Sequence, residues 1–542
     1  MSATAPPIDT RPKGADSDAP FDIFIIGGGI NGCGVARDAA GRGLSVALAE
    51  MGDLAQATSS SSTKLFHGGL RYLEYFELRL VREALQEREI LLSAMPHISW
   101  PMRFVLPYHP DMRFESRTPL SRILSTVMPW TKGRRPAWLI RHGLFIYDRL
   151  GGQSSLPGTR TVDLTRDAAG AALQDKYTLA YEYSDCWVQD ARLVVLNARD
   201  AAARGATIMV RTKVVSAQRD GPLWRITVEG PQGRATYRAR TLVNAAGPWV
   251  DQVLQGTLGL SDKPLVRLVR GSHIVTRRLF GHDRAYFFQG TDGRIIFAIP
   301  YEQDFTLIGT TDQDHEGQPG EAECSEAEQR YLCDFASAYF KTPVQPRDVI
   351  WSYSGIRPLY NDGSRSASAL TRDYVLKVED VEGSAPILNI FGGKITTYRR
   401  LSESAMARLS PYFTSLASDW TAGVFLPGGD FEPGDLLQVI AELEQDYPFL
   451  GPTWAARLIR HYGTEARKIL GDATCTGDLG RDFGATLTEA EVDWLIDREW
   501  ARSTEDIIWR RTKLGLRLNK AQVASLSAYM RARQDEDGSE IS

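Results

Sequence analysis

The sequence predicts an α/β fold of mixed α+β character, with a Rossmann-like domain, a second domain on a mixed or antiparallel sheet, and an all-helical C-terminal domain. Three observations predict it. A short apolar run, a glycine cluster and a helical pattern follow one another from Phe21, a strand-rich stretch covers 266–311, and helical periodicity begins after about Gly428. The length of 542 residues also favours several domains over a single core.

The first predicted element is a βαβ unit. Residues 21–26, FDIFII, form an apolar run rich in β-branched side chains, as in a buried parallel strand. A helical pattern covers 35–40, glycines at 41 and 43 end it, and 44–49 is the next predicted strand.

The connection between this strand and helix carries Gly27-x-Gly29-x-x-Gly32. The first glycine permits a tight turn, the second lets the backbone approach a pyrophosphate, and the third lets the helix pack on the strand. Glu50 ends the next strand, where its carboxylate would accept hydrogen bonds from a ribose diol. The residues predicted to bind the dinucleotide here are Gly27, Gly28, Gly29, Asn31, Gly32 and Glu50.

The following segment favours a flavin dinucleotide over a nicotinamide one. The sequence has no second G-x-G-x-x-G loop for a separate nicotinamide cofactor, and the run 58–69, TSSSSTKLFHGG, offers hydroxyls, glycines and a lysine to a pyrophosphate and a flavin edge. Taken without its context the run would be a serine-rich linker, but an apolar stretch follows it directly. The predicted cofactor contacts are Thr58, Ser59, Ser60, Ser62, Lys64, Leu65, His67 and Gly68.

Periodicity predicts further elements. Helices are expected over 78–93 and 190–204, and strands over 207–214, 223–228, 240–247, 295–299 and 306–308. Thr488-x-x-Glu491 and Ser503-x-x-Asp506 are predicted capping boxes of C-terminal helices.

Composition excludes several classes of function. The net charge of -4 lacks the basic excess of a nucleic-acid-binding protein, so no nucleic-acid partner is expected. The five cysteines form no C-x-x-C pair, which predicts reduced thiols and no metal site. No uninterrupted apolar run approaches the ~18 residues of a membrane-spanning helix, so any membrane contact would be peripheral.

Ordered motifs along the chain carry a family resemblance. Besides the glycine loop they are ATSS at 57–60, KLFHGGLRY at 64–72, EYSDCW at 182–187, NAAGPW at 244–249, GSH at 271–273, IGTTD at 308–312, YSGIRPL at 353–359, TRDY at 371–374 and FGGKITTYR at 391–399. From Phe21 to about Arg533 the chain closely resembles the aerobic, FAD-dependent glycerol-3-phosphate dehydrogenases of bacteria, which belong to the D-amino-acid-oxidase-like flavoprotein group.

This resemblance implies a reaction and a location. Glycerol 3-phosphate would be oxidised at C2 to dihydroxyacetone phosphate, and FAD would take the hydride at N5 and pass electrons to ubiquinone or a similar quinone. The enzyme would be cytoplasmic and attached peripherally to the lipid surface of the inner membrane. A homodimer is left open.

The resemblance also places residues at the substrate phosphate. Arginine suits a phosphate dianion because its planar fork matches two oxygens. Arg71, Arg357 and Arg372 lie in matching motifs, and Tyr72 is a further predicted substrate contact.

The expected catalytic residues are His273, Arg357 and Lys394. His273 is favoured as the base that removes the hydroxyl proton, while His67 or an arginine that orients the hydroxyl remain open. Lys394 is the expected cation near flavin N1 and the C2 carbonyl, where it would favour the reduced ring. The remaining predicted cofactor contacts are Val214, Ala246, Gly247, Trp249, Gly393, Lys394, Ile395 and Thr396.

The expected division of the chain has four parts. They are a disordered tail at 1–20, an FAD-dependent oxidoreductase region at 21–427, a helical domain at 428–533 and a frayed tail at 534–542. Within the oxidoreductase region the FAD-binding parts are expected at about 21–75, 178–255 and 350–410, interleaved with cap parts at about 76–177 and 256–349.

One stretch departs from the family pattern. Between Met112 and Pro136 this chain carries more residues than family members do. The segment places apolar side chains at helical spacing among basic ones. The basic residues are Arg113, Arg117, Arg122, Lys132, Arg134 and Arg135, against Glu115 alone among the acids. A basic amphipathic segment suits an anionic membrane, and a helix packed on the protein surface is the alternative.

Other functions remain open at this point. A glycerol-3-phosphate oxidase would share these motifs and use oxygen as acceptor. An enzyme acting on an amino acid or a 2-hydroxy acid would need a carboxylate site instead. A flavin-binding protein without catalysis would have no need of intact motifs around Arg357, Arg372 and Lys394.

Overall fold

The structure is a computed structural model that describes residues 19–110, 112, 136–152, 154–260, 264–290, 294–361 and 373–539. Most of the predicted N-terminal tail, almost all of the basic stretch at 112–136, and Arg372 lie outside the described residues.

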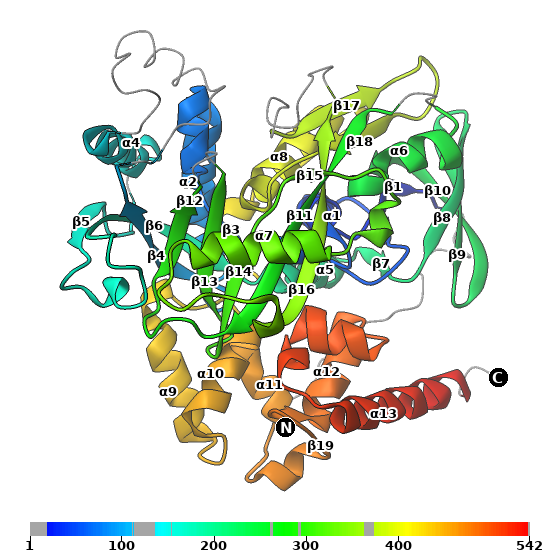
Figure 1. The fold of residues 1–542 in the computed structure, drawn as a ribbon. Helices are drawn as coiled ribbons and strands as arrows, with labels where there is room; N and C mark the ends of the chain where they lie inside the picture. The colour runs from blue at the N-terminus through cyan, green and yellow to red at the C-terminus, as the bar shows by residue number, and fades with distance from the viewer. Residues whose placement is uncertain are drawn as a thin grey trace.

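The first sheet is the Rossmann-like one that the βαβ unit predicted. In the described residues it has 8 strands in the order β17-β18-β10-β1-β2-β7, with β9 on β10 and β8 on β9 (Figure 1). The strands from β18 to β7 run parallel. The bounds are β1 Phe21–Ile26, β2 Val46–Ala49, β7 Thr207–Met209, β8 Lys213–Asp220, β9 Leu223–Gly230, β10 Gly233–Asn244, β17 Val375–Glu379 and β18 Ile387–Phe391.

Helices complete the core around this sheet. α1 packs against both α5 and α8, and their apolar side chains share one buried cluster with β1. The bounds are α1 Ile30–Gly41, α5 Asp190–Ala203, α6 Val250–Gln252 and α8 Tyr398–Leu409. Because parallel strands all end at one edge, the connections after β1, β2, β10 and β18 meet there.

The second sheet is mainly antiparallel, as predicted, with β4 and β12 as a parallel pair. In the described residues it has 10 strands in the order β15-β11-β14-β13-β12-β4-β6-β3, with β16 on β11 and β5 on β6. The bounds are β3 Leu65–Phe66, β4 Ser99–Tyr108, β5 Arg160–Asp163, β6 Leu179–Val188, β11 Val266–Arg277, β12 Ala285–Gln289, β13 Ile295–Tyr301, β14 Phe305–Gly309, β15 Gln313–Asp314 and β16 Val349–Tyr360. β3, β6 and β16 belong to this sheet although they fall in ranges expected to bind FAD.

Helices α2, α4 and α7 accompany the second sheet, and α7 crosses in front of it in Figure 1. The bounds are α2 Leu78–Ala94, α4 Ala137–Leu150 and α7 Glu326–Ser337. No helix among the described residues is long and apolar enough to cross a bilayer.

The C-terminal domain is helical, as predicted, apart from a short two-stranded sheet. It lies below both sheets in Figure 1, coloured orange to red, and has its own buried cluster. The bounds are α9 Leu436–Asp446, α10 Gly451–Tyr462, α11 Ala466–Leu470, β19 Asp482–Gly484, β20 Leu487–Thr488, α12 Glu489–Glu499, the π-helix η15 Asp506–Arg511 and α13 Lys520–Ser539.

The predicted strand over 207–214 is wrong in its middle. β7 ends at Met209 and β8 begins at Lys213, because Arg211 adopts φ +52° between them. The backbone N–H of Arg211 donates to the carbonyl of Gly52 at 2.8 Å instead of continuing a strand.

One predicted capping box is confirmed and one is wrong. The N–H of Ser503 donates to Asp506 at 2.9 Å, and the N–H of Asp506 donates back to the Ser503 hydroxyl at 3.3 Å. Thr488 makes no such side-chain bond, because Glu491 accepts hydrogen bonds from Arg457 and Tyr462.

Candidate active site

The glycine loop joins β1 to α1 with almost no free space behind it. Gly27 has φ +111°, where side chains are disfavoured. A Cβ on Gly32 would lie 1.9 Å from the Gly27 carbonyl oxygen, and one on Gly28 would lie 2.8 Å from the Glu50 Cβ. Gly28 and Gly32 are therefore needed for the loop to pack against Glu50 and against itself, while Gly29 brings no side chain to the N-terminus of α1.

Glu50 follows β2 and lies against this loop. Its carboxylate accepts hydrogen bonds from the backbone N–H groups of Gly28 at 2.6 Å and Gly52 at 2.8 Å. Burial raises the pKa of Glu50, and these two N–H groups oppose the rise. The acid is thus fixed beside the glycine loop, where the sequence predicted a ribose contact.

The connection after β18 reaches the same place. The side-chain amide of Asn31 donates to the carbonyl of Gly392 at 3.0 Å, and Gly392 and Gly393 have φ +71° and +99°. This turn leads into Lys394, whose Nζ lies 3.8 Å from the ring centroid of Tyr72. Residues distant in sequence therefore converge on the start of α1.

The hydroxyls of the Ser/Thr-rich run have protein partners. Ser59 accepts from the N–H of Ile30 at 3.0 Å, and Thr58 donates to the carbonyl of Ile356 on β16 at 2.5 Å. Ser60 donates to the Ala57 carbonyl at 3.2 Å. The run packs between the glycine loop and the second sheet, so it is not a linker.

Lys64, predicted to line the cofactor, is paired inside the protein. Its Nζ lies 2.9 Å from the Asp190 carboxylate and donates to the Ser60 carbonyl, and both charged side chains are 1% exposed. Asp190 also accepts from the hydroxyl of Ser62 at 2.7 Å. These bonds anchor the run to the N-terminus of α5 and largely neutralise the charge of Lys64.

A buried polar network fixes the backbone of the loop at His67 and Gly68. The N–H of Gly68 donates to the hydroxyl of Tyr147 at 2.7 Å, Tyr147 donates to Asp185 at 2.8 Å, and Arg88 pairs with Asp185 at 2.9 Å. Burial raises the pKa of Asp185 to about 6, against the lowering effect of Arg88. Burial, and then Lys394, lower the pKa of His67 to about 4, so its imidazole is neutral at pH 7.

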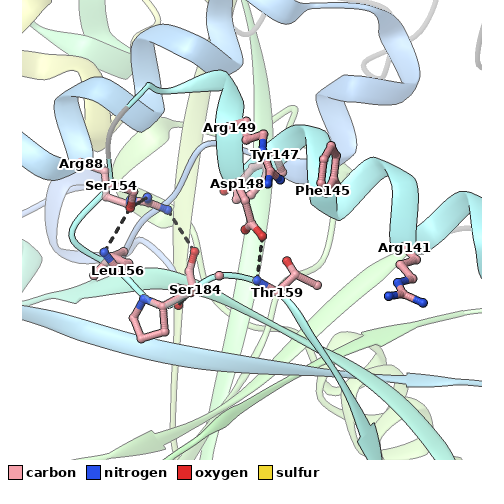
Figure 2. Close-up of a pocket in the computed structure, with 12 residues that line it drawn as sticks. Arg88, Arg141, Phe145, Tyr147, Asp148, Arg149, Ser154, Leu156, Thr159 and Ser184 are labelled. Atoms are coloured by element: carbon pink, nitrogen blue, oxygen red, sulfur yellow. Dashed lines mark hydrogen bonds between the residues drawn. The ribbon is translucent and has the colours of Figure 1, made fainter.

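A cavity of about 450 Å³ lies beside this network, and Figure 2 shows residues that line it. Arg88, Tyr147 and Ser184 line its inner side, and Asp148 accepts a hydrogen bond from the Thr159 N–H at 2.7 Å. None of the described lining residues is a predicted cofactor or substrate contact. The cavity is therefore separate from the glycine loop.

Arg357 projects from β16 across β11 of the second sheet. A Cβ on Gly271 would lie 2.4 Å from the Arg357 Nη2, so glycine at this position makes room for the guanidinium. Arg357 pairs with Asp312 and donates to the Thr310 hydroxyl at 3.3 Å. Its side chain is 29% exposed, which leaves part of the fork accessible to an anion.

His273 lies nearby on β11 but is 2% exposed. Its Nε2 is 3.0 Å from the Thr63 hydroxyl, and its ring stacks on Tyr353 with 4.8 Å between centroids. A Cβ on Gly309 would lie 2.1 Å from the imidazole, so this glycine makes room for the ring. Burial first, and then two nearby cations, lower the pKa of His273 well below its usual value.

The other predicted site residues lie around this centre. Tyr72 and Arg71 are in the 3-10 helix η2, Leu70–Tyr75, which follows the His67 loop. Ala246, Gly247 and Trp249 are in the turn after β10, where Gly247 has φ +55°. Val214 is buried among Ala49 and Met209, Leu65 pairs with Trp187 in the second sheet, and Ile395 and Thr396 form a 3-10 turn after Lys394.

Comparison with known protein families identifies the family of this chain. The family model described as FAD dependent oxidoreductase matches residues 22–399. The chain belongs to this family. A second model, the C-terminal domain of alpha-glycerophosphate oxidase, matches residues 420–538.

Curated relatives of this FAD-dependent oxidoreductase cover nearly its whole length. It is 50% identical over 506 residues to the D-erythritol 1-phosphate dehydrogenase of Brucella abortus, covering 93% of this chain and 96% of the relative. It is 45% identical over 511 residues to the aerobic glycerol-3-phosphate dehydrogenase of Escherichia coli, covering 94% and 97%. The predicted resemblance is thereby confirmed.

A solved structure supports the fold. The glycerol-3-phosphate dehydrogenase of Bacillus halodurans, complexed with FAD, superimposes with a TM-score of 0.70 at 24% identity and covers 96% of this chain and 90% of that one.

The cofactor of this oxidoreductase is FAD. The residues fit it: the glycine loop leaves no room for side chains against the backbone, helix α1 presents its N-terminus, and Glu50 is fixed beside the loop. This arrangement is compatible with the predicted contacts of the glycine loop with the pyrophosphate and of Glu50 with the ribose, and the turn at Gly393 and Lys394 borders the same loop.

Several residues that hold the site together were not predicted from the sequence. Asp185 and Asp312 lie in motifs that carried the resemblance, so a local signal for them existed. Tyr147 and Asp190 carried no such signal, because each meets its partner from a segment far away in the chain.

Proposed function

We propose that this enzyme oxidises sn-glycerol 3-phosphate at C2 to dihydroxyacetone phosphate and passes the electrons to a membrane quinone. The observation that carries the proposal is the 45% identity with the Escherichia coli aerobic glycerol-3-phosphate dehydrogenase over almost the whole of both chains. The site is compatible with it, because cations and neutral imidazoles lie around the place where the FAD loop and the second sheet meet.

Arg357 is the proposed phosphate ligand. Its fork suits a dianion, and because its partner Asp312 is 37% exposed, we expect a bound phosphate to compete with that carboxylate for the guanidinium. Arg71, Tyr72 and Arg372 are proposed from the sequence as further substrate contacts.

Bound FAD supplies the acceptor for the hydride that leaves C2. Lys394 supplies positive charge next to Tyr72, in the turn that contacts the glycine loop through Asn31.

The hydroxyl proton requires a base, and both candidate histidines are in the neutral form that accepts a proton. His273 is the primary proposal, and its 2% exposure means that it reaches substrate only if the segment around Thr63 moves. His67 is the alternative. Comparing His273→Asn with His67→Asn separates them: loss of the base lowers kcat and changes its pH profile.

Anaerobic addition of glycerol 3-phosphate to the holoenzyme tests the proposal. The flavin absorbance should bleach, and an added quinone should restore it. A flavin that stays oxidised would exclude this substrate, and no bleaching by any related compound would support a non-catalytic flavin protein.

A second substrate is favoured by a specific observation. The 50% identical relative is named a D-erythritol 1-phosphate dehydrogenase, and D-erythritol 1-phosphate is a polyol monophosphate with one carbon more than glycerol 3-phosphate. The same bleaching experiment with both compounds shows which of them reduces the flavin. Comparison of their kcat/KM values then identifies the preferred substrate. Amino acids and 2-hydroxy acids in the same assay test the carboxylate alternative.

The acceptor and the location complete the proposal. Oxygen consumption without added quinone would identify an oxidase rather than a dehydrogenase. We propose peripheral attachment to the inner face of the cytoplasmic membrane, where ubiquinone or a similar quinone is dissolved; sedimentation with vesicles that contain anionic lipid tests it. Analytical ultracentrifugation tests a homodimer.

A further inference from the structure

The loop that carries Glu50 is bonded on both of its sides. Towards the cofactor, Glu50 accepts from the N–H groups of Gly28 and Gly52. On the opposite side, the carbonyl of Gly52 accepts from the N–H of Arg211 at 2.8 Å, and the carbonyl of Glu50 accepts from the N–H of Thr212 at 2.7 Å. The position of the ribose acid therefore depends on what fixes residues 50–53.

Asp53, the last residue of this loop, is bound by the C-terminal domain. Its carboxylate accepts two hydrogen bonds from the guanidinium of Arg511, both at 2.8 Å, and one from Arg510 at 2.5 Å. Asp53 is 1% exposed and Arg511 is 0% exposed. The guanidinium of Arg511 also donates to the Glu499 carbonyl at 2.6 Å, which fixes it within its own domain.

A second bridge runs beside the first. Asp506, at the start of η15, accepts from the side chain of Arg211 at 2.8 Å, and the backbone of Arg211 is bonded to Gly52. Burial alone would raise the pKa of Asp506, but Arg510 and the N–H of Arg502 lower it to about 2. The carboxylate is therefore charged at neutral pH, and both bridges are ionic.

The location of these bridges gives them a specific consequence. Asp506, Arg510 and Arg511 all belong to η15. This helix lies in a domain that contributes no strand to either large sheet. A buried carboxylate is strongly unfavourable without its cation. Among residues 50–53, Asp53 therefore depends on η15 for its counterions, while Glu50 and Gly52 are also held by backbone hydrogen bonds.

We propose that Arg511 and Arg510 are positioning residues for FAD: through Asp53 they hold the loop that presents Glu50, so FAD affinity depends on the docked C-terminal domain. The proposal rests on the assignment of FAD to the glycine loop. It does not depend on the substrate, so it and the proposed function fail separately.

The test measures FAD release from the full-length holoenzyme, followed by the rise in flavin fluorescence after dilution. Asp53→Asn and Arg511→Gln should each release FAD at least about tenfold faster than the wild type. Asp53→Asn takes the carboxylate from both guanidinium groups, and Arg511→Gln removes two of the three hydrogen bonds to the buried carboxylate. The double variant should be no faster than the single ones, because both substitutions break the same link. At saturating FAD, kcat should stay within about twofold.

Arg457→Gln is the matched control. It breaks a buried pair with Glu491, at 2.7 Å, inside the same domain and away from residues 50–53. It should lower the melting temperature comparably and leave FAD release within about twofold of the wild type, since no bond to the FAD loop is lost. Release as fast as in Arg511→Gln would attribute the effect to general destabilisation and overturn the proposal, as would wild-type release from Asp53→Asn.

Arg510→Gln guards against failure of the stronger variants to fold. It removes one of the two guanidinium groups at Asp53 and leaves both bonds from Arg511. A measurable acceleration of FAD release supports the proposal, and wild-type release from this variant overturns it if Asp53→Asn and Arg511→Gln give no soluble holoenzyme.

Discussion

The hydroxyl of Tyr147 accepts a hydrogen bond from the buried N–H of Gly68 at 2.7 Å and links the loop after β3 to helix α4. The same hydroxyl donates to Asp185. One phenol oxygen thus satisfies a loop amide and a buried carboxylate, next to the candidate site.

Replacing this tyrosine by phenylalanine should destabilise the protein. Tyr147→Phe leaves the Gly68 amide without its acceptor, which should lower the free energy of unfolding by about 1–3 kcal/mol. Tyr237→Phe is the control, because the buried Tyr237 hydroxyl has no hydrogen-bond partner among the described residues. Urea unfolding compares the two, and equal effects would contradict the role of the Tyr147 hydroxyl.

Breaking the Lys64–Asp190 pair should be costly. Lys64→Met leaves the Asp190 charge buried and unpaired, which should lower the free energy of unfolding by about 3–5 kcal/mol. Adding Asp190→Asn should recover much of this loss. Arg234→Gln, which breaks an exposed pair with Glu229, should change stability by less than about 1 kcal/mol. A Lys64→Met protein as stable as the wild type would show that the pair is not needed.

Arg357→Lys should weaken substrate binding while the flavin remains bound. A lysine keeps the charge but loses the fork, and this should raise KM for the phosphate substrate by about 10–100-fold. Arg225→Lys, at an exposed site on β9, serves as the control. Steady-state kinetics with an artificial acceptor measure the effect, and unchanged KM and kcat would remove Arg357 from the phosphate site.

Lys513 should give stability a measurable pH dependence. Burial, and then repulsion from Lys64, lower its pKa to about 7 in the folded protein, against 10.5 as the ordinary value. Between these two values the unfolded chain binds a proton that the folded chain does not, so the free energy of unfolding rises with pH, by up to about 1.4 kcal/mol per unit.

Lys513→Met removes this dependence. The free energy of unfolding of the variant should exceed that of the wild type by most at pH 7. This difference should shrink as the pH approaches 10. Guanidinium unfolding at pH 7, 8, 9 and 10 measures the difference, and a constant difference over this range would refute the prediction.

Deleting Phe114 to Arg134 tests the membrane hypothesis. These residues lie outside the described part of the chain, and the prediction rests on their basic, amphipathic sequence. Removing them should reduce sedimentation with vesicles containing phosphatidylglycerol and leave bleaching by substrate intact. Unchanged sedimentation would favour the alternative of a helix packed on the protein.

The sequence by itself determined the features that depend on local physics. The apolar run at Phe21–Ile26 specifies a buried strand, and Gly27 and Gly32 specify a turn whose backbone has no room for side chains. These signals arise within a few residues of one another, so they identify the Rossmann-like unit and its loop. The comparison with relatives then confirmed the flavoprotein family that the distributed motifs indicated.

Tertiary structure alone decided which charges act on which residues. The sequence predicted Lys64 as a cofactor contact and His273 as the base, and the structure adds that Lys64 pairs with Asp190 and that His273 contacts Thr63 and Tyr353. The link from Arg511 to Asp53 joins residues whose separation in the chain gives no sequence signal. The physical reason is that burial and pairing depend on long-range packing: a local pattern fixes the type of side chain that is available, and only the fold fixes its counterion and its access to solvent.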